Sequence, residues 1–205
     1  MRVGLYHRHI LPCLTHLAMR SHRLQPFRAR VAGAAEGIVL ELGAGSGLNL
    51  PFYGPRVREV LALEPSADLR AIAARRQAPV PARWLDASAE SLPLEDRSVD
   101  TVVTTWTLCT IPDAGQALAE ARRVLRPGGR LLFVEHGRAP APSVARWQDR
   151  LDPYWGRIAG GCHLNRPIDR LIAAAGFRLT TLAATRALPG PATHTFFYEG
   201  AATPG

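Results

Sequence analysis

The chain has 205 residues, of which 47% are hydrophobic and 20% are charged, a composition typical of one globular domain with a full core. The formal net charge is +8, but every one of the 25 basic residues is an arginine, so the excess indicates a compositional bias; a surface for anionic lipid or nucleic acid is the alternative. The sequence contains no apolar stretch of 18 residues and no signal-peptide pattern. We therefore expect a cytoplasmic protein.

The cysteines do not predict a cross-linked or metal-bound fold. Cys13, Cys109 and Cys162 are odd in number, lie far apart in the sequence and include no C-x-x-C pair. This spacing indicates neither a disulfide framework nor a zinc site, and it fits a reducing compartment.

Residues 1–35 predict an N-terminal helical cap. Pro12 lies near a helix start, and a helical stripe is formed by Ile10, Leu14, Leu17 and Leu24. Three interpretations remain open: simple packing against the core, a lid from which Tyr6 or His7 reaches inward, and a basic amphipathic surface that rests on a membrane.

An apolar strand from Ile38 to Leu42 runs directly into three glycines at alternate positions, Gly43, Gly45 and Gly47. Such a run predicts a tight binding loop, because only a backbone without Cβ atoms turns sharply and lets a flat ligand approach. A dinucleotide loop would place its last glycine at Leu48. The carboxylate of Glu41 would repel a pyrophosphate but attract the sulfonium and amino groups of S-adenosylmethionine, so the pattern favours a methyl donor.

The next apolar run, Val57 to Leu63, ends at Glu64, about 20 residues after the loop begins. A carboxylate at the tip of the second strand accepts hydrogen bonds from both ribose hydroxyls of a nucleotide. Pro65 follows, and Ser66 is an N-cap candidate for a helix through Gln77.

The rest of the chain alternates between strand and helix patterns, which predicts a mostly parallel, doubly wound α/β sheet. The expected elements are strands at 82–86, 99–105 and 130–135, helices at 113–125, 144–155 and 167–175, a turn at 126–129, and a last pair of runs at 177–185 and 193–199. The last pair predicts an antiparallel hairpin, and the final five residues predict a frayed tail. The core of this single domain would span residues 36–200.

Taken together, these residues resemble the class I S-adenosylmethionine-dependent methyltransferases, from Ile38 to Phe177. The resemblance implies a Rossmann-like fold with a seven-stranded sheet and S-adenosyl-L-methionine as cofactor. Ser88 stands where many relatives have an aspartate for the adenine amino group, with Asp86 two residues earlier. The predicted donor-binding residues are Glu41, Gly43, Ala44, Gly45, Gly47, Asn49, Glu64, Pro65, Ser66, Ser88, Ala89, Glu90, Thr105 and Trp106.

Four strings make the chain similar to the methyltransferase-like 7 branch of thiol methyltransferases and its bacterial relatives: residues 48–53, 107–110, 133–136 and 161–166. The resemblance implies a small-molecule acceptor, with a thiol as the leading candidate. Animal members carry an N-terminal membrane anchor, and membrane residence is not transferred to this chain.

Methyl transfer is an in-line displacement at a sulfonium carbon, which needs neither a metal nor a covalent enzyme intermediate. A thiolate acceptor would react best in a dry pocket, which Trp106, Leu108 and Cys109 would line. A neutral acceptor would need a general base, and the candidate catalytic residues are His136 and His163, each of which is alternatively a polar wall residue.

Four other functions stay open. A lipid or quinone acceptor at a membrane surface is the nearest alternative. Nucleic-acid methylation is disfavoured, because residues 104–107 read Thr-Thr-Trp-Thr and not the Asn/Asp-Pro-Pro-aromatic signature that holds a base. An NAD-dependent oxidoreductase is disfavoured by Glu41 and Leu48, and a non-catalytic donor-binding protein is the last alternative.

Overall fold

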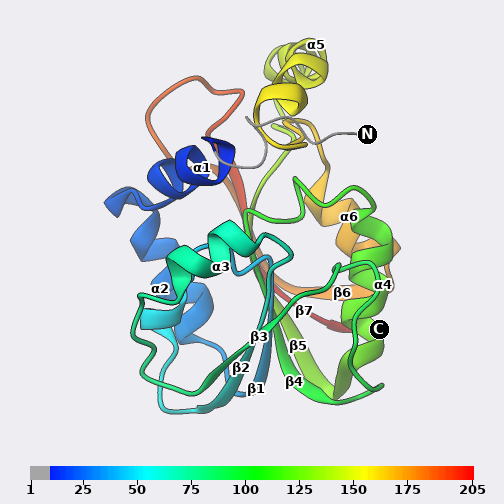
Figure 1. The fold of residues 1–205 in the computed structure, drawn as a ribbon. Helices are drawn as coiled ribbons and strands as arrows, with labels where there is room; N and C mark the ends of the chain where they lie inside the picture. Colours follow the sequence, from blue (N-terminus) through cyan, green and yellow to red (C-terminus); the bar gives the residue numbers. More distant parts are fainter. Residues whose placement is uncertain (1–9) are drawn as a thin grey trace.

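The computed structural model describes residues 10–205, and the interpretation that Tyr6 or His7 reaches inward concerns residues outside this range. The elements (Figure 1) are α1 Leu11–Met19, η2 His22–Leu24, α2 Gln25–Gly33, β1 Gly37–Leu42, η3 Leu50–Phe52, β2 Val57–Leu63, α3 Ala67–Ala73, β3 Ala82–Leu85, β4 Val99–Thr105, α4 Ala114–Val124, β5 Leu125–His136, α5 Pro142–Ile158, α6 Ile168–Ala174, β6 Phe177–Arg186 and β7 Phe196–Pro204.

The strands form one seven-stranded sheet in the order β3-β2-β1-β4-β5-β7-β6. The first five strands are parallel, and β7 runs antiparallel between β5 and β6. This arrangement confirms the predicted doubly wound sheet with its C-terminal hairpin. The strand order reverses between β1 and β4, and ligands of such sheets bind outside the carboxyl ends of the strands at this switch point.

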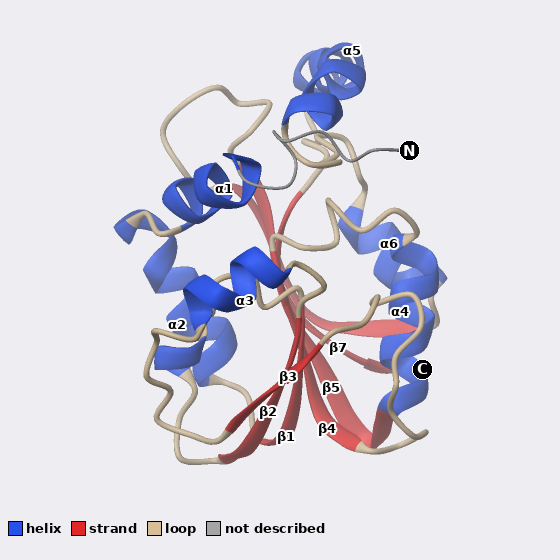
Figure 2. Cartoon of the chain, in the orientation of Figure 1, coloured by secondary structure: helices blue, strands red, loops and turns tan. Residues whose placement is uncertain are grey.

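Helices cover both faces of the sheet (Figure 2), and each face has its own apolar core. Leu118, Phe133 and Ile172 belong to the core beneath α4 and α6. Val31 and Val60 belong to the core beneath α2. The β strands are therefore buried on both sides, which explains their near-continuous apolar sequences.

α5 stands apart from the sheet, above the carboxyl ends of the strands (Figure 1). It is strongly amphipathic, with Ala145 and Gln148 buried and most of its other side chains exposed. The segment that follows it returns to the strand ends before α6 begins. The N–H of His163, in this returning segment, donates to the carbonyl of Cys109 in the loop after β4, so long-range packing and not local sequence joins the two segments.

The predicted N-terminal cap is helical, but the four apolar residues of the predicted stripe do not form one buried face. Leu24 is buried, whereas Ile10, Leu14 and Leu17 are 51%, 49% and 58% exposed. α1 packs beside α3 over the strand ends and not flat against the sheet, so these three side chains stay exposed.

Three local predictions also need correction. The helix after Ser66 ends at Ala73 and not at Gln77. The turn at 126–129 is part of β5, where Arg130 pairs with Thr101 and the residues before it form a bulge. The last residues form part of β7, where Ala201 and Ala202 pair with both neighbouring strands; this pairing satisfies the backbone that a frayed tail would expose to water.

Candidate active site

The glycine loop after β1 lies against the end of β2, where the backbone N–H of Ala44 donates to the carbonyl of Leu63 at 2.9 Å. Gly43, Gly45 and Gly47 have φ angles of +64°, +56° and +71°, which favour glycine. A Cβ at Gly43 would collide with the side chain of Thr107, whereas one at Gly45 would meet no atom closer than 3.9 Å. The loop is therefore packed behind Gly43 and open beside Gly45.

Glu64 follows β2 and is the carboxylate that the sequence predicts to bind the ribose. Its Oε2 accepts the N–H of Gly45 at 2.9 Å, and its Oε1 accepts the N–H of Ser66 at 2.8 Å. Burial raises the pKa of Glu64, and these two backbone bonds oppose the rise. Ser66 accepts from the N–H of Leu69 and caps α3, as predicted. The fold thus brings Gly45, Glu64 and Ser66 together.

Glu41 lies beneath the loop and is 1% exposed. Its two carboxylate oxygens accept from the amide of Asn49 at 2.7 Å and from the hydroxyl of Tyr53 at 2.8 Å. Asn49 also donates to Thr105 and accepts from Arg28, so all its polar atoms are used within the protein. Burial raises the pKa of Glu41 to about 7, although the bonds from Tyr53 and Asn49 oppose the shift. The Glu41 carboxylate can therefore act on a ligand through its electrostatic field and through the loop that it supports.

Trp106 begins the loop after β4 and is one of two non-glycine residues with positive φ among the described residues, at +52°. Its ring contacts Phe27 and Phe197 edge-on, and the guanidinium of Arg28 lies 4.8 Å from the ring centroid. Its indole N–H is buried without a hydrogen-bond partner. Backbone strain and an unpartnered buried donor often occur at functional sites.

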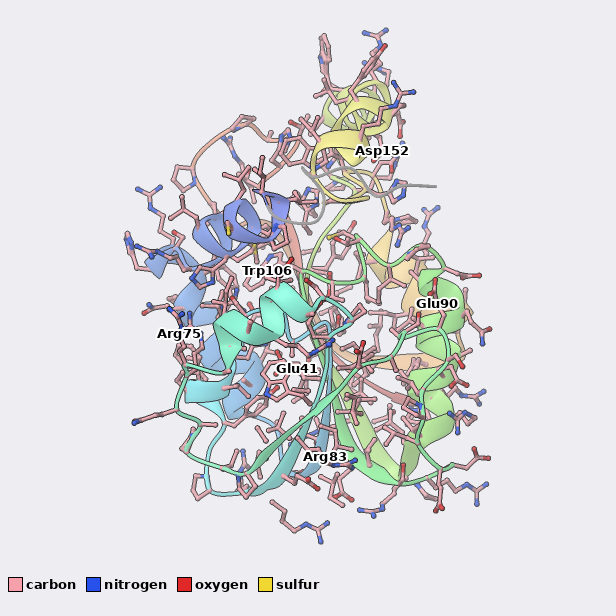
Figure 3. All side chains as sticks on the ribbon, viewed as in Figure 1. Glu41, Arg75, Arg83, Glu90, Trp106 and Asp152 are labelled. Carbon is pink, nitrogen blue, oxygen red and sulfur yellow. The ribbon has the colours of Figure 1, made fainter. Side chains whose placement is uncertain are left out.

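The predicted adenine segment lies farther along the edge, toward α4 (Figure 3). The hydroxyl of Ser88 donates to Glu90 at 2.6 Å, and Glu90 also accepts the N–H of Asp113 before α4. Ala89 is buried, and Asp86 forms an ion pair with Arg70 at 2.8 Å. Ser88 and Glu90 are therefore held by each other and by α4, separate from the contacts of Glu64.

α1 contacts the donor loop directly. Nδ1 of His16 lies 2.6 Å from Oγ of Ser46, and the guanidinium of Arg76 donates to the carbonyl of Ser46 at 2.7 Å. α1 therefore touches this loop at Ser46, and the lid interpretation of the N-terminal cap stays a prediction. Two surface hollows, of about 430 and 450 Å³, lie against α4 and α6 and are lined by none of the predicted site residues.

The two candidate histidines lie at the carboxyl end of β5 and in the segment after α5. Nδ1 of His163 contacts Oδ2 of Asp152, from α5, at 2.9 Å, and its side chain is 41% exposed. His136 ends β5, is 6% exposed, and has its Nε2 3.3 Å from the carbonyl of Thr193. An aspartate that holds one ring nitrogen leaves the other free for proton transfer. The Asp152 partner of His163 was not predicted from the sequence.

Sequence reasoning also missed a cluster formed by Cys109, His136 and Cys162, whose ligand-type atoms all lie within 4.8 Å of one another. The two sulfurs are 3.6 Å apart, although the residues are 53 positions apart in the sequence. The hydrogen bond between the sulfurs lowers the pKa of Cys162, with help from His136, and raises the pKa of Cys109, which is also fully buried. The adjacent parallel strands β4 and β5 could have predicted that Cys109 and His136 meet, but no sequence signal placed Cys162 beside them.

Leu108, predicted to line an acceptor pocket, is fully buried in the apolar core. The backbone N–H groups of Thr107 and Leu108 both donate to Glu135, and Thr104 donates to the same carboxylate at 2.6 Å. Burial raises the pKa of Glu135 to about 7, and these three groups oppose the rise. Glu135 therefore fixes the loop that carries Trp106 and Cys109.

Comparison with known proteins agrees with this geometry. The family model described as "Methyltransferase domain" matches residues 40–133, which include the glycine loop, Glu64 and β4. This match and the similarity to curated methyltransferases support assignment of the chain to the class I S-adenosylmethionine-dependent methyltransferases, in agreement with the resemblance found in the sequence. S-adenosyl-L-methionine is the cofactor of that family.

Two kinds of relatives are similar to this methyltransferase. The rat "Thiol S-methyltransferase TMT1B" is 38% identical over 149 residues, which cover 69% of this chain and 60% of that protein. The "Ubiquinone/menaquinone biosynthesis C-methyltransferase UbiE" of Rubrivivax gelatinosus is 38% identical over 117 residues, which cover 56% of this chain and 46% of that protein. The chain thus spans less than two thirds of the length of either relative.

The fold is shared with solved methyltransferases. The crystal structure of a SAM-dependent methyltransferase from Thermotoga maritima, described as a possible histamine N-methyltransferase, has a TM-score of 0.64 at 21% identity and covers 97% of this chain and 100% of that one. At this identity the likeness shows the fold alone. Within residues 10–205 no helix has the length and apolar character needed to cross a bilayer.

Proposed function

We propose that this methyltransferase transfers the methyl group of S-adenosylmethionine to a small thiol. The observation that carries the donor half of the proposal is the carboxylate of Glu64, held 2.9 Å from the N–H of Gly45 at the carboxyl end of β2. A ribose placed there would donate its hydroxyls to Glu64 while the backbone of the open Gly45 face contacts the rest of the nucleoside. We call residues 41–49 and 64–66 the donor side.

In this proposal the buried Glu41 network supports the sulfonium and amino groups of the donor. The amide of Asn49 and the hydroxyl of Tyr53 hold the carboxylate in place, so its negative field needs no reorganisation when a cation arrives. A cation nearby would lower the raised pKa of Glu41 and favour its ionised form. Ser88, Ala89 and Glu90 would border the adenine.

The acceptor would approach from the segments that carry His136, Asp152 and His163, which we call the acceptor side. The imidazole of His163, held by Asp152, accepts the proton of the thiol. The thiolate sulfur then forms a bond to the methyl carbon while the bond from that carbon to the sulfonium sulfur breaks. The products are a methyl thioether and S-adenosylhomocysteine, and the opposite charges of the reactants cancel, so a site that excludes water favours the step.

Support for a thiol comes from the similarity to the thiol methyltransferases and from the site itself. The acceptor side presents two imidazole groups, the buried one of His136 and the partly exposed one of His163, and an imidazole can accept the proton of a thiol. His136 is the second base candidate, but its Nε2 already contacts the carbonyl of Thr193.

The test is transfer of an isotopic methyl group from labelled donor to a panel of thiols, phenols, amines, quinones and lipids. We expect label in thioethers, and we expect the Glu64→Ala variant to lose it. Saturable donor binding in calorimetry with no labelled product on any acceptor would contradict the proposal and favour the non-catalytic donor-binding alternative.

A quinone or lipid acceptor is the second candidate, and one surface favours it. α5 exposes an apolar stripe while the arginines beside it, Arg146, Arg150 and Arg157, are also exposed. The stripe consists of Trp147, Leu151, Tyr154 and Ile158, which are 56%, 37%, 68% and 58% exposed. An apolar helix face flanked by arginines suits the surface of an anionic membrane. Label that enters quinone or lipid only when anionic vesicles are present would support this candidate over a soluble thiol.

A further inference from the structure

A cluster of sulfur and nitrogen atoms lies on the acceptor side, at the carboxyl ends of β4 and β5, and its two cysteines have no role in the proposed methyl transfer. It consists of Sγ of Cys109, Sγ of Cys162 and a ring nitrogen of His136. We propose that these three side chains bind a thiophilic divalent cation of the Zn²⁺ type.

The distance between the sulfurs fits a shared metal better than a disulfide. A tetrahedral zinc site with Zn–S bonds of about 2.3 Å places two thiolate sulfurs about 3.8 Å apart, whereas a disulfide requires about 2.05 Å. The sulfurs of Cys109 and Cys162 are 3.6 Å apart. A cation could therefore bridge them with little movement, but a disulfide would require the sulfurs to approach by about 1.5 Å.

The imidazole of His136 is oriented for the same role. Its Nε2 lies 3.3 Å from the carbonyl oxygen of Thr193, so this nitrogen carries the hydrogen and donates a hydrogen bond to that oxygen. Nδ1 is then the unprotonated nitrogen, able to bind a cation. A backbone carbonyl that holds the far nitrogen of a metal-binding histidine fixes both the tautomer and the ring orientation.

Backbone contacts hold the two cysteine segments together without a cation. The N–H of His163 donates to the carbonyl of Cys109 at 2.7 Å. The guanidinium of Arg166 donates to the carbonyls of Leu108 and Ile111 at 2.5 and 2.6 Å. These bonds join the loop after β4 to the segment after α5, so little conformational freedom remains to be lost on binding.

Burial favours a cation between these groups. Cys109 is 3% exposed and His136 is 6% exposed. Two thiolates and one divalent cation sum to zero charge, so the cation removes the penalty of burying anionic sulfur. Among residues 10–205 no further His, Cys, Asp or Glu side chain completes the group. A fourth coordination position is left for water or another ligand, the arrangement typical of catalytic zinc sites and not of closed structural ones.

The experiment loads the reduced, untagged full-length chain with zinc and measures bound metal by mass spectrometry after buffer exchange. We expect about one zinc per chain, and we expect Cys162→Ser and His136→Gln to weaken zinc binding by at least about 100-fold. Cys13→Ser is the matched control, because Cys13 is exposed on α1 and should leave zinc binding unchanged. Circular dichroism of each variant reports whether it folds.

Cobalt substitution of the unmodified chain tests the same ligands without any variant. Co²⁺ bound by two thiolates gives strong thiolate-to-metal charge-transfer absorption in the near ultraviolet and tetrahedral bands in the visible region. Their appearance at one equivalent supports the site. Three results would each overturn the proposal. The fully reduced chain could retain less than about a tenth of an equivalent of zinc, or the cobalt spectrum could lack thiolate bands. The third is a folded Cys162→Ser variant that binds zinc like the unmodified chain.

Discussion

The donor side and the acceptor side meet at the same edge of the sheet but are built differently. On the donor side, backbone N–H groups and one carboxylate meet within a few residues of the ends of β1 and β2, as in the bonds from Gly45 and Ser66 to Glu64. On the acceptor side, single side chains come from β5, α5 and the loops after β4 and α5, as in the contact between Cys109 and Cys162. The donor side, built from backbone groups, suits a ligand that is the same throughout a family. The acceptor side, built from single side chains, allows the acceptor to differ between members.

The largest expected loss of donor binding is that of the Gly45→Val variant. Gly45 has a φ of +56°, and a side chain there would project into the open space beside the loop. We expect calorimetry to detect no donor binding, because a β-branched residue is strained at this φ and occupies the ligand's space. Gly54→Ala is the control, since its Cβ would meet no atom within 4 Å. Affinity of Gly45→Val within about tenfold of the unmodified protein would show that the donor does not lie against this loop.

Glu64→Ala tests the predicted ribose contact. Two hydrogen bonds to a charged carboxylate contribute about 1.5–3 kcal/mol each, so we expect donor affinity to fall by about 100-fold or more. Calorimetry measures the affinity. Glu59→Ala, on the same strand, removes only a surface ion pair with Arg83 and should bind the donor normally. Equal affinities for the Glu64 and Glu59 variants would exclude Glu64 from the donor site.

His163→Gln tests whether His163 is the base on the acceptor side. The variant removes the proposed base, so kcat/KM for an alkyl thiol should fall by about tenfold or more near pH 7 and recover as the pH rises and the thiol ionises in solution. An aromatic thiol that is already ionised at neutral pH should react almost normally. His22→Gln, on the exposed η2 segment, is the control. Equal losses for both thiols at every pH would assign His163 a role other than proton transfer.

The smallest expected effect concerns stability and not activity. The pKa of Glu41 is raised to about 7 by burial, so the folded protein binds a proton that the unfolded chain releases near pH 4.5. Stability therefore decreases as the pH rises from about 4.5 to about 7, by up to about 3 kcal/mol for this group. Glu135, with a similar pKa, adds to the same decrease.

Glu41→Gln should remove about half of this pH dependence. The amide retains an oxygen for Asn49 and donates to the hydroxyl of Tyr53, so we expect the variant to fold. Urea unfolding at pH 5 and pH 8 measures the difference for each protein. The same difference in the variant and in the unmodified chain would show that Glu41 does not titrate in this range.

Local sequence determined the parts of the protein whose chemistry lies in the backbone. The donor side was predicted from three local features: alternate glycines after an apolar strand, an acid at the end of the next strand, and Ser66 as N-cap. Each of these residues lies close to its hydrogen-bond partner at the end of a strand. The alternation of strands and helices likewise predicted the sheet and its final hairpin. The exposed stripe of α1 and the pairing of the last residues in β7 were missed, because both depend on which element is available to pack against them.

Only the tertiary structure decided what surrounds the acceptor. The fold places Asp152 beside His163, buries Glu41 under Asn49 and Tyr53, and brings Cys162 to Cys109 and His136. These contacts join segments that share no strand and no helix, so no periodicity or motif encodes their distance. Their positions follow from the return of the segment after α5 to the loop after β4, where long-range packing and not local propensity sets the geometry.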